Sequence, residues 1–208
     1  MLILLRHGQS ESNAAGLLVG RSDPPLTDLG VRQAEAAGRY LAAELLSGER
    51  DHPPRSLLVL SSPLQRARAT AEIVARECGQ GAEVEVDEQL IELDYGKFDG
   101  LTLGQVEPAD WAAWRADPSW RPPGGETLVE LQERVTAWCD SLRSDGDDGD
   151  VIAVSHVSPI KAAAIWALKA GPELAWRLSL GVATITRIST SAPSLVSFGE
   201  TGHMAGVR

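Results

Sequence analysis

LILLRHG, residues 2–8, is an apolar run that stops abruptly at an arginine, a histidine and a glycine. An uninterrupted aliphatic run of this length is typical of a strand that is buried on both faces of a parallel sheet. The same pattern occurs twice more, as LLVLSS at residues 57–62 and as VIAVSH at residues 151–156. The sequence therefore predicts three buried strands, each of which places polar side chains at its carboxyl end.

Helices are expected between these strands, because apolar residues recur there at spacings of three and four. The alternation of strand and helix predicts an α/β fold, a three-layer αβα sandwich with a mostly parallel central sheet and helices on both faces. The predicted helices cover residues 27–48, 63–77, 128–142 and 158–169, and shorter strands are predicted at residues 83–86, 182–188 and 195–198, the last two as a pair at the sheet edge.

The length of 208 residues, with 43% hydrophobic and 23% charged residues, suits one domain over residues 1–208 that folds on its own. Within it, residues 101–124 are predicted to be an irregular excursion from the sheet, because tryptophans and prolines alternate there without a clear period. Trp111, Trp114 and Trp120 either pack this excursion against the body of the domain, which is the favoured interpretation, or line a substrate cleft.

The net charge of -10 excludes a general affinity for nucleic acid or for an anionic membrane. Any anion-binding pocket must therefore be a local cluster of arginines, of which residues 1–70 hold eight. The two cysteines form no disulfide framework, and no run of about 18 apolar residues occurs. These features predict a cytoplasmic protein, and sixteen arginines against three lysines favour a bacterial source.

The polar residues that follow the three apolar strands are expected to meet in space. Ligands bind outside the carboxyl ends of the strands in open α/β sheets. Arg6 and His7 follow the first strand, Arg66 comes a turn after the second, and His156 follows the third. Two arginines and two histidines in one pocket would bind phosphate. No metal and no cofactor is required if these groups carry the charge.

Five segments of the chain resemble the histidine phosphatase superfamily, also called phosphoglycerate mutase-like, in the order that the family has them. The resemblance extends from Leu2 to about Lys161, and a pattern of five ordered segments is specific where a lone Arg-His-Gly would not be. The segments are LILLRHGQSESN at 2–13, SSPLQRARATAE at 61–72, LIELDYG at 90–96, GGET at 124–127 and VSHVSP at 154–159.

The resemblance implies a role for each matching residue. His7 would be the nucleophile that forms a phosphohistidine, which requires a neutral imidazole with one free nitrogen. Glu92 would be the general acid that protonates the leaving group. Phosphoryl oxygens would be bound by Arg6, Arg66 and His156, with Asn13 as a neutral donor and Arg21 and Ser22 as further candidates in the loop above the pocket.

Each of these residues also has a purely structural interpretation. Either histidine could be a hydrogen-bonded structural residue, and Arg66 could be an exposed helix residue like Arg68. Glu92 could belong to a solvated acidic face. More often than not, loop residues such as Arg21 and Ser22 only shape their loop. The GGET segment could equally be a helix cap or part of the pocket rim.

The predicted function is that of a metal-independent phosphomonoesterase acting on a small soluble phosphate ester. The nearest alternative is a cofactor-dependent phosphoglycerate mutase, which is disfavoured because such mutases are longer. A second alternative is a module that binds phosphorylated ligands without turnover. Two departures from the family pattern, Val157-Ser158 and Phe98-Asp99-Gly100, leave the substrate open, and the oligomeric state, a homodimer included, is open as well.

Overall fold

The computed structural model describes residues 1–46, 57–79, 83–144 and 149–207, and is built around one six-stranded sheet of order β3-β2-β4-β1-β5-β6. The first four strands in this order are parallel, whereas β5 and β6 run antiparallel to their neighbours. The strands are β1 (Leu2–Arg6), β2 (Leu57–Ser61), β3 (Val84–Val86), β4 (Asp150–Ser155), β5 (Ile185–Ser189) and β6 (Ser194–Glu200).

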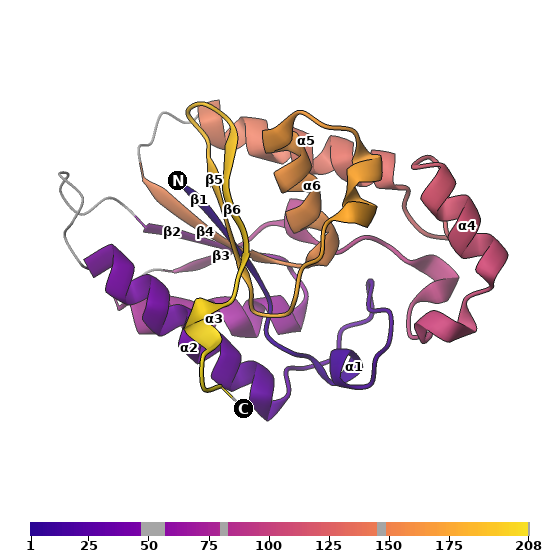
Figure 1. Ribbon diagram of the computed structural model, residues 1–208. Helices are drawn as coiled ribbons and strands as arrows, with labels where there is room; N and C mark the ends of the chain where they lie inside the picture. Colours follow the sequence, from indigo (N-terminus) through magenta and orange to yellow (C-terminus); the bar gives the residue numbers. More distant parts are fainter. Residues whose placement is uncertain (47–56, 80–82, 145–148, 208) are drawn as a thin grey trace.

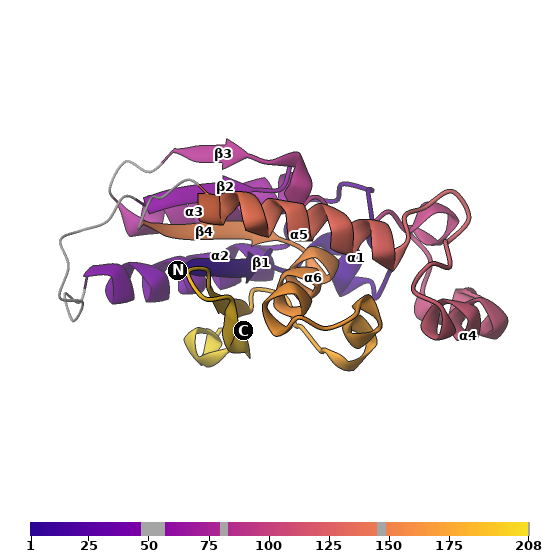
Figure 2. The same ribbon diagram turned by 90° about the horizontal axis from the view of Figure 1, so that it is seen from above.

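Helices cover both faces of this sheet, as Figures 1 and 2 show. In Figure 1, α2 (Asp28–Leu46) and α3 (Gln65–Cys78) lie below the sheet, and α5 (Leu128–Ser144) and α6 (Val157–Leu168) lie above it. Two shorter helices, α1 (Glu11–Ala14) and α4 (Pro108–Ala116), lie near one end of the strands. The predicted three-layer αβα sandwich with a mostly parallel central sheet is therefore confirmed.

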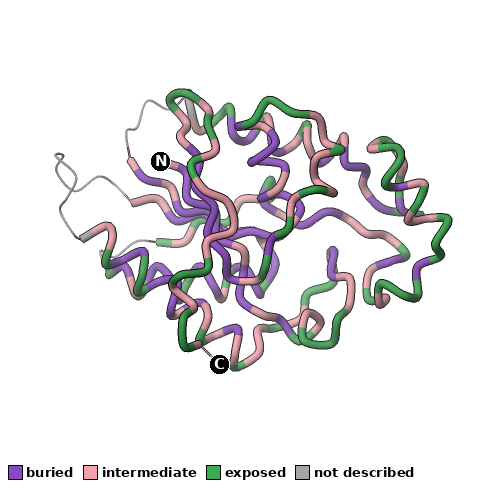
Figure 3. Tube along the Cα trace, in the orientation of Figure 1, coloured by how far each residue is buried: buried purple, intermediate pink, exposed green. Residues whose placement is uncertain are grey.

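The apolar runs of the central strands are buried on both faces, as predicted. In β1, Leu2 and Leu4 pack into the core under α5 and α6, while Ile3 and Leu5 pack into the core over α2 and α3. Each of these four side chains is at most 1% exposed, which corresponds to roughly 1.5–3 kcal/mol of hydrophobic stabilisation per residue. Figure 3 shows the centre of the sheet as continuously buried chain.

The C-terminal strands differ slightly from the prediction. They do pair with each other, but β5 also pairs with β1, so of these two strands β6 alone lies at a sheet edge. The predicted strand from Val182 begins instead at Ile185, because Ala183 has a positive φ of 53° that extended chain does not allow. At the start of α2, the Thr27 hydroxyl accepts a hydrogen bond from the Gly30 amide, and the predicted end at residues 47–48 lies outside the described residues.

The stretch over residues 101–124 is more regular than predicted. It contains α4, which begins at Pro108, a residue whose fixed φ and missing N–H suit the first turn of a helix. Trp114 is 1% exposed and packs in the main core, whereas Trp111 and Trp120 are partly buried. Among the helices of the described residues, none is long and apolar enough to cross a membrane.

The strand order brings the three predicted polar junctions together. β2, β4 and β1 are adjacent and parallel, so their carboxyl ends lie side by side. The pairing continues beyond the strands: the His7 amide donates to the Ser155 carbonyl, and the Ser62 amide donates to the Val154 carbonyl, both at 3.0 Å. Backbone hydrogen bonds therefore hold His7 and Ser62 at the carboxyl ends of the strands. His156 lies at the same end of the sheet because it directly follows β4.

Candidate active site

His7 lies directly after β1 and is 2% exposed. Its Nδ1 is 2.7 Å from the Gly8 carbonyl, a contact in which the ring must be the donor, so Nδ1 carries the proton. Nε2 is then an acceptor, and the Nε of Arg66 donates to it at 3.3 Å. Burial, together with the charges of Arg6 and Arg66, holds the pKa of His7 well below its ordinary value. The imidazole is therefore neutral, with a lone pair on Nε2.

Gly8 holds the carbonyl that fixes this tautomer. A Cβ at Gly8 would lie 2.3 Å from the Gly30 carbonyl oxygen at the start of α2, so only glycine permits this close approach. The Gly8 amide donates to the Thr70 hydroxyl at 3.1 Å, and that hydroxyl donates to the Arg66 carbonyl at 2.8 Å. Thr70, one helical turn after Arg66, therefore connects α3 to the loop that orients the His7 ring.

Arg66 lies in the first turn of α3 and is fully buried, so its interpretation as an exposed helix residue is wrong. Besides the contact with His7, its guanidinium donates to the carbonyls of Ser22 and Gly20 at 2.7 and 3.0 Å. Burial lowers the pKa of this arginine, and the negative charge of Glu92 opposes that effect. The arginine therefore positions the loop over the site and presents a cation to the reactive nitrogen of His7.

Arg6 completes the cationic side of the site. One of its terminal nitrogens donates to the Leu180 carbonyl at 2.6 Å. Its Nε is buried and has no hydrogen-bond partner among the described residues. Burial lowers the pKa of Arg6, while Glu92 and Tyr95 raise it through their charges. A buried guanidinium N–H without a partner is costly, and an anionic oxygen placed in the site would pair with it.

His156 faces His7, with their ring centroids 5.0 Å apart. The Ser62 hydroxyl accepts from the Leu64 amide at 3.4 Å and lies 2.7 Å from His156 Nε2. When this hydroxyl donates to Nε2, the ring proton is on Nδ1, which is buried and has no partner in the described part of the chain. Burial and the neighbouring His7 and arginine charges lower the pKa of His156, so the ring is neutral.

Glu92 lies beyond β3 and is 2% exposed, which rules out a solvated acidic face. One carboxyl oxygen, Oε1, accepts from the amides of Leu93 at 2.7 Å and Ser158 at 3.2 Å. Burial raises the pKa of Glu92, and the two hydrogen bonds and the charges of Arg66 and Arg6 only partly oppose this rise. The second carboxyl oxygen can therefore carry a proton at a higher pH than an exposed glutamate does.

The three remaining candidates make structural contacts. Asn13 accepts from the amide and the hydroxyl of Ser10 in the capping box of α1. Arg21 lies 3.5 Å from a carboxyl oxygen of Glu126. The Ser22 hydroxyl donates to Asp99 at 2.6 Å. Contact of Asn13, Arg21 and Ser22 with substrate stays a prediction.

The GGET segment forms the entry to α5. The Thr127 amide and hydroxyl contact Glu130, whose own amide donates to the Thr127 hydroxyl at 3.0 Å. Glu126 pairs with Arg134 at 3.1 Å. The structure thus supports the helix-cap interpretation of this segment.

Sequence reasoning missed several residues that hold the site together. Thr70 could have been found from its spacing of four from Arg66, which places both on one helix face. Ser62 was noted only as a polar strand end, although its hydroxyl lies 2.7 Å from His156 Nε2. Leu180 and Gly20 contribute only backbone carbonyls, so their residue types carry no signal.

The chain belongs to the histidine phosphatase superfamily (branch 1), whose family model matches residues 2–197. The resemblance stated from five sequence segments is therefore confirmed, and with it the prediction of an enzyme of this superfamily. The chain is similar to a mycobacterial glucosyl-3-phosphoglycerate phosphatase solved with VO3, at 30% identity and a TM-score of 0.82, covering 96% of this chain and 98% of that one.

Curated relatives include a mutase as well. The chain is 32% identical to the 2,3-bisphosphoglycerate-dependent phosphoglycerate mutase of Nitrobacter winogradskyi, covering 92% of this chain and 93% of the relative. The chain is also 35% identical to a bifunctional protein of Mycobacterium tuberculosis. The match covers 98% of this chain and 54% of that protein. The chain thus matches about half the length of some curated relatives. Family membership by itself leaves hydrolysis and phosphoryl transfer between substrates as two possible reactions.

Proposed function

We propose that this protein is a metal-independent phosphomonoesterase that hydrolyses small phosphate esters through a phosphohistidine on His7. The observation that carries the proposal is the environment of His7 Nε2, an unprotonated buried nitrogen beside the Arg66 guanidinium. Two further buried donors, Arg6 Nε and His156 Nδ1, have no protein partner in the described residues. Phosphoryl oxygens supply the acceptors that these donors require, and the two guanidinium groups neutralise the phosphoryl charge without a metal.

The reaction has two steps in this proposal. In the first, the lone pair of His7 Nε2 attacks phosphorus, the bond from phosphorus to the ester oxygen breaks, and Glu92 gives its proton to the leaving alcohol. In the second, the Glu92 carboxylate takes a proton from water, the water oxygen attacks phosphorus, and the P–N bond breaks to release inorganic phosphate. Glu92 ends protonated and His7 neutral, so both groups return to the states that their burial favours.

Hydrolysis is favoured over the mutase reaction by the space next to Glu92. A phosphoglycerate mutase must hold a carboxylate and two phosphate groups during transfer, which calls for several cations around the substrate. Of the described residues that line the cavity beside Glu92, Lys161 is the one charged residue. A pure binding module is disfavoured because it has no use for a buried carboxyl group whose pKa is raised.

Phosphate release and interconversion of 2- and 3-phosphoglycerate, measured side by side, test the choice of reaction. We expect release of phosphate from simple alkyl phosphates, and interconversion without net release would contradict the proposal. Quenching in alkaline detergent with ³²P-labelled substrate should trap a phosphohistidine, whose label survives base and is lost in acid. His7→Ala should abolish both label and turnover, whereas the matched control His203→Ala, at a histidine whose ring contacts the Ala183 carbonyl and none of the residues assigned to the phosphoryl group, should keep both. Labelling of His7→Ala would exclude His7 as the nucleophile.

A further inference from the structure

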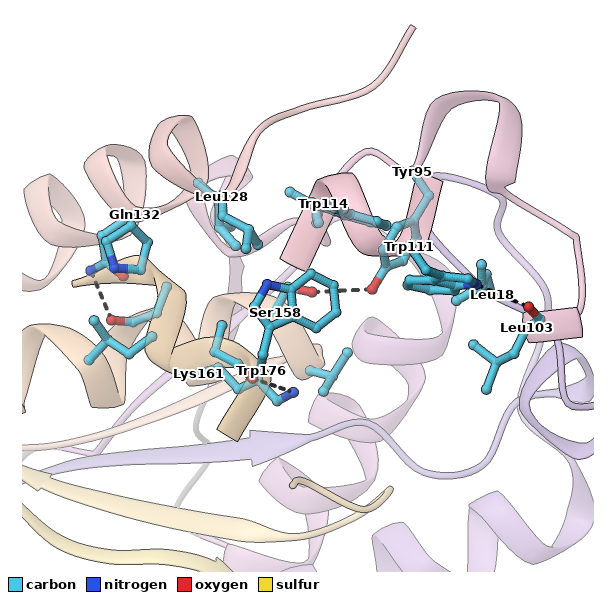
Figure 4. A pocket seen from close by; sticks show the side chains of 17 residues that line it. Leu18, Tyr95, Leu103, Trp111, Trp114, Leu128, Gln132, Ser158, Lys161 and Trp176 are labelled. Atoms are coloured by element: carbon cyan, nitrogen blue, oxygen red, sulfur yellow. Dashed lines mark hydrogen bonds between the residues drawn. The ribbon is translucent and has the colours of Figure 1, made fainter. Parts of the chain in front are cut away.

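A cavity of about 200 Å³ lies directly beside Glu92. Leu93 and Ser158 both line this cavity, and the backbone amides of the same two residues donate to Glu92 Oε1. Tyr95, another lining residue, has its hydroxyl 3.3 Å from that of Ser158 (Figure 4). The cavity therefore lies next to the two residues that hold the proposed general acid, which places it beside the leaving alcohol of the proposed reaction.

Three tryptophans form an aromatic wall of this cavity, as Figure 4 shows. The indoles of Trp111 and Trp114 are stacked at 5.7 Å and 12°, and Trp176 meets both edge-on, at 86° and 83°. The Arg115 guanidinium lies 5.6 Å from the ring of Trp111 and 5.9 Å from that of Trp176, which fixes the two rings relative to each other. The wall is thus a built feature, with rings from α4 and from the segment Pro172–Arg177.

A few polar atoms are present among these rings. The indole N–H groups of Trp114 and Trp176 are buried and have no partner among the described residues, whereas that of Trp111 donates to the Leu103 carbonyl. Lys161 donates to the Ala175 carbonyl at 3.1 Å, and its burial lowers its pKa. The remaining lining is largely aliphatic, including Leu18 and Ile165. A ligand that suits this lining is mostly apolar and carries an oxygen acceptor for an unpaired indole N–H.

We propose that this cavity binds the alcohol part of the substrate, and that this part carries an apolar ring, aromatic or alicyclic. The inference rests on the proposed phosphatase function, because it assigns the leaving group of that reaction. The space is sufficient, since an apolar cavity of about 150 Å³ already holds benzene. A sugar or polyol suits this position less well, because most of its hydroxyl groups would lose their hydrogen bonds with water against the largely aliphatic and aromatic lining.

The test compares three phosphate esters of primary alcohols, so that the demand on Glu92 is similar in each. The esters are 2-phenylethyl phosphate, ethyl phosphate and glycerol 1-phosphate. Burial of the phenyl ring predicts a kcat/KM for the phenylethyl ester that is roughly 10- to 100-fold above that for the other two. Equal values, or a preference for the glycerol ester, would overturn the assignment of the cavity.

Trp176→Ala should reduce the ratio of phenylethyl to ethyl ester to a few-fold, and Trp176→Phe should restore most of it, because a ring is again present. The ratio is the readout, since a general loss of folded enzyme lowers both rates together. Trp166→Ala is the matched control: this tryptophan is also partly buried, but it donates to Asp140 and does not line the cavity. An unchanged ratio in Trp176→Ala, or a reduced ratio in Trp166→Ala, would contradict the proposal.

A binding measurement separates this inference from the proposed function. 2-Phenylethanol, titrated against the protein and followed by tryptophan fluorescence, should bind and should quench less in Trp176→Phe than in the unmodified protein. If no ester is hydrolysed but the alcohol binds in this way, the phosphatase proposal fails while the cavity proposal stands. If esters are hydrolysed without preference and the alcohol does not bind, the cavity proposal alone fails.

Discussion

Replacement of Arg66 by lysine should be severe, although both residues are cations. The Arg66 guanidinium is fully buried and uses three separate nitrogens, one for His7, one for the Gly20 carbonyl and one for the Ser22 carbonyl. A lysine ammonium offers one nitrogen on a flexible chain, so it cannot keep all three partners. Arg68, two residues later on the same helix, is exposed and provides the matched control.

The contacts set the size of the effect. If the buried Gly20 carbonyl is left unpaired, the cost is about 1–3 kcal/mol, whereas the Ser22 carbonyl lies at the surface and can be hydrated for about 0.5–1.5 kcal/mol. Because lysine can keep one of these bonds, we expect Arg66→Lys to lower the free energy of unfolding by about 1–3 kcal/mol. Loss of one positioned donor to the phosphoryl group should lower kcat by a further 10²- to 10³-fold, on the order of an oxyanion-hole deletion.

Urea unfolding followed by tryptophan fluorescence measures the first effect, and phosphate release from ethyl phosphate under conditions where both variants are folded measures the second. Arg68→Lys should match the unmodified protein in both assays. If Arg66→Lys were as stable as Arg68→Lys, the three hydrogen bonds would contribute nothing to the free energy of unfolding. If it were also as active, the assignment of Arg66 to the phosphoryl group would be refuted.

Four further outcomes are expected. Glu92→Gln should slow ethyl phosphate hydrolysis by roughly 10²- to 10⁴-fold and p-nitrophenyl phosphate far less, because the latter leaving group needs little protonation; equal slowing would remove Glu92 from the acid role. The same variant should be at least as stable at neutral pH, because a group whose pKa is raised by folding loses its stabilising contribution as pH rises through that pKa. The acid limb of kcat for p-nitrophenyl phosphate should lie below pH 6.5, since burial and the arginines lower the pKa of His7, and a limb at or above 6.5 would contradict a buried neutral nucleophile. Ser62→Ala should lower kcat with little change in KM by freeing the tautomer of His156, and Ser62→Thr should restore kcat; a purely structural role would instead affect stability in both variants alike.

The sequence was most informative where one local pattern decides the structure. Three apolar runs that end in polar residues predicted the buried strands, and the rule that ligands bind at the carboxyl ends of strands predicted that Arg6, His7 and His156 would meet. Period-three spacing predicted the helices on both faces. These features depend on short segments, so each could be read without knowledge of the rest of the fold.

Other features depend on contacts between distant segments and could not be predicted in this way. The surroundings of Glu92 depend on a distant segment, because Ser158, whose amide donates to its carboxyl group, is 66 residues away. The acidic neighbours of Glu92 in the sequence left a solvated face open as an alternative. The cavity combines α4, α6 and the segment Pro172–Arg177, and its aromatic wall became apparent only when these elements were placed together. The role of a residue that contributes only a backbone carbonyl, such as Gly20, cannot be inferred from its residue type.

Burial shifts the pKa values of His7 and Glu92 in opposite directions, and both shifts suit the roles proposed for these residues. At their ordinary pKa values of 6.5 for histidine and 4.5 for glutamate, the two groups would form an ion pair over the range between, with the proton on the wrong partner. Removal from water disfavours both charged forms, so the pKa of His7 falls while that of Glu92 rises. The arginines reinforce the change at His7 and oppose it at Glu92, where burial still dominates. The dry interior, rather than a specific proton relay, therefore favours the neutral histidine and the protonated form of the glutamate.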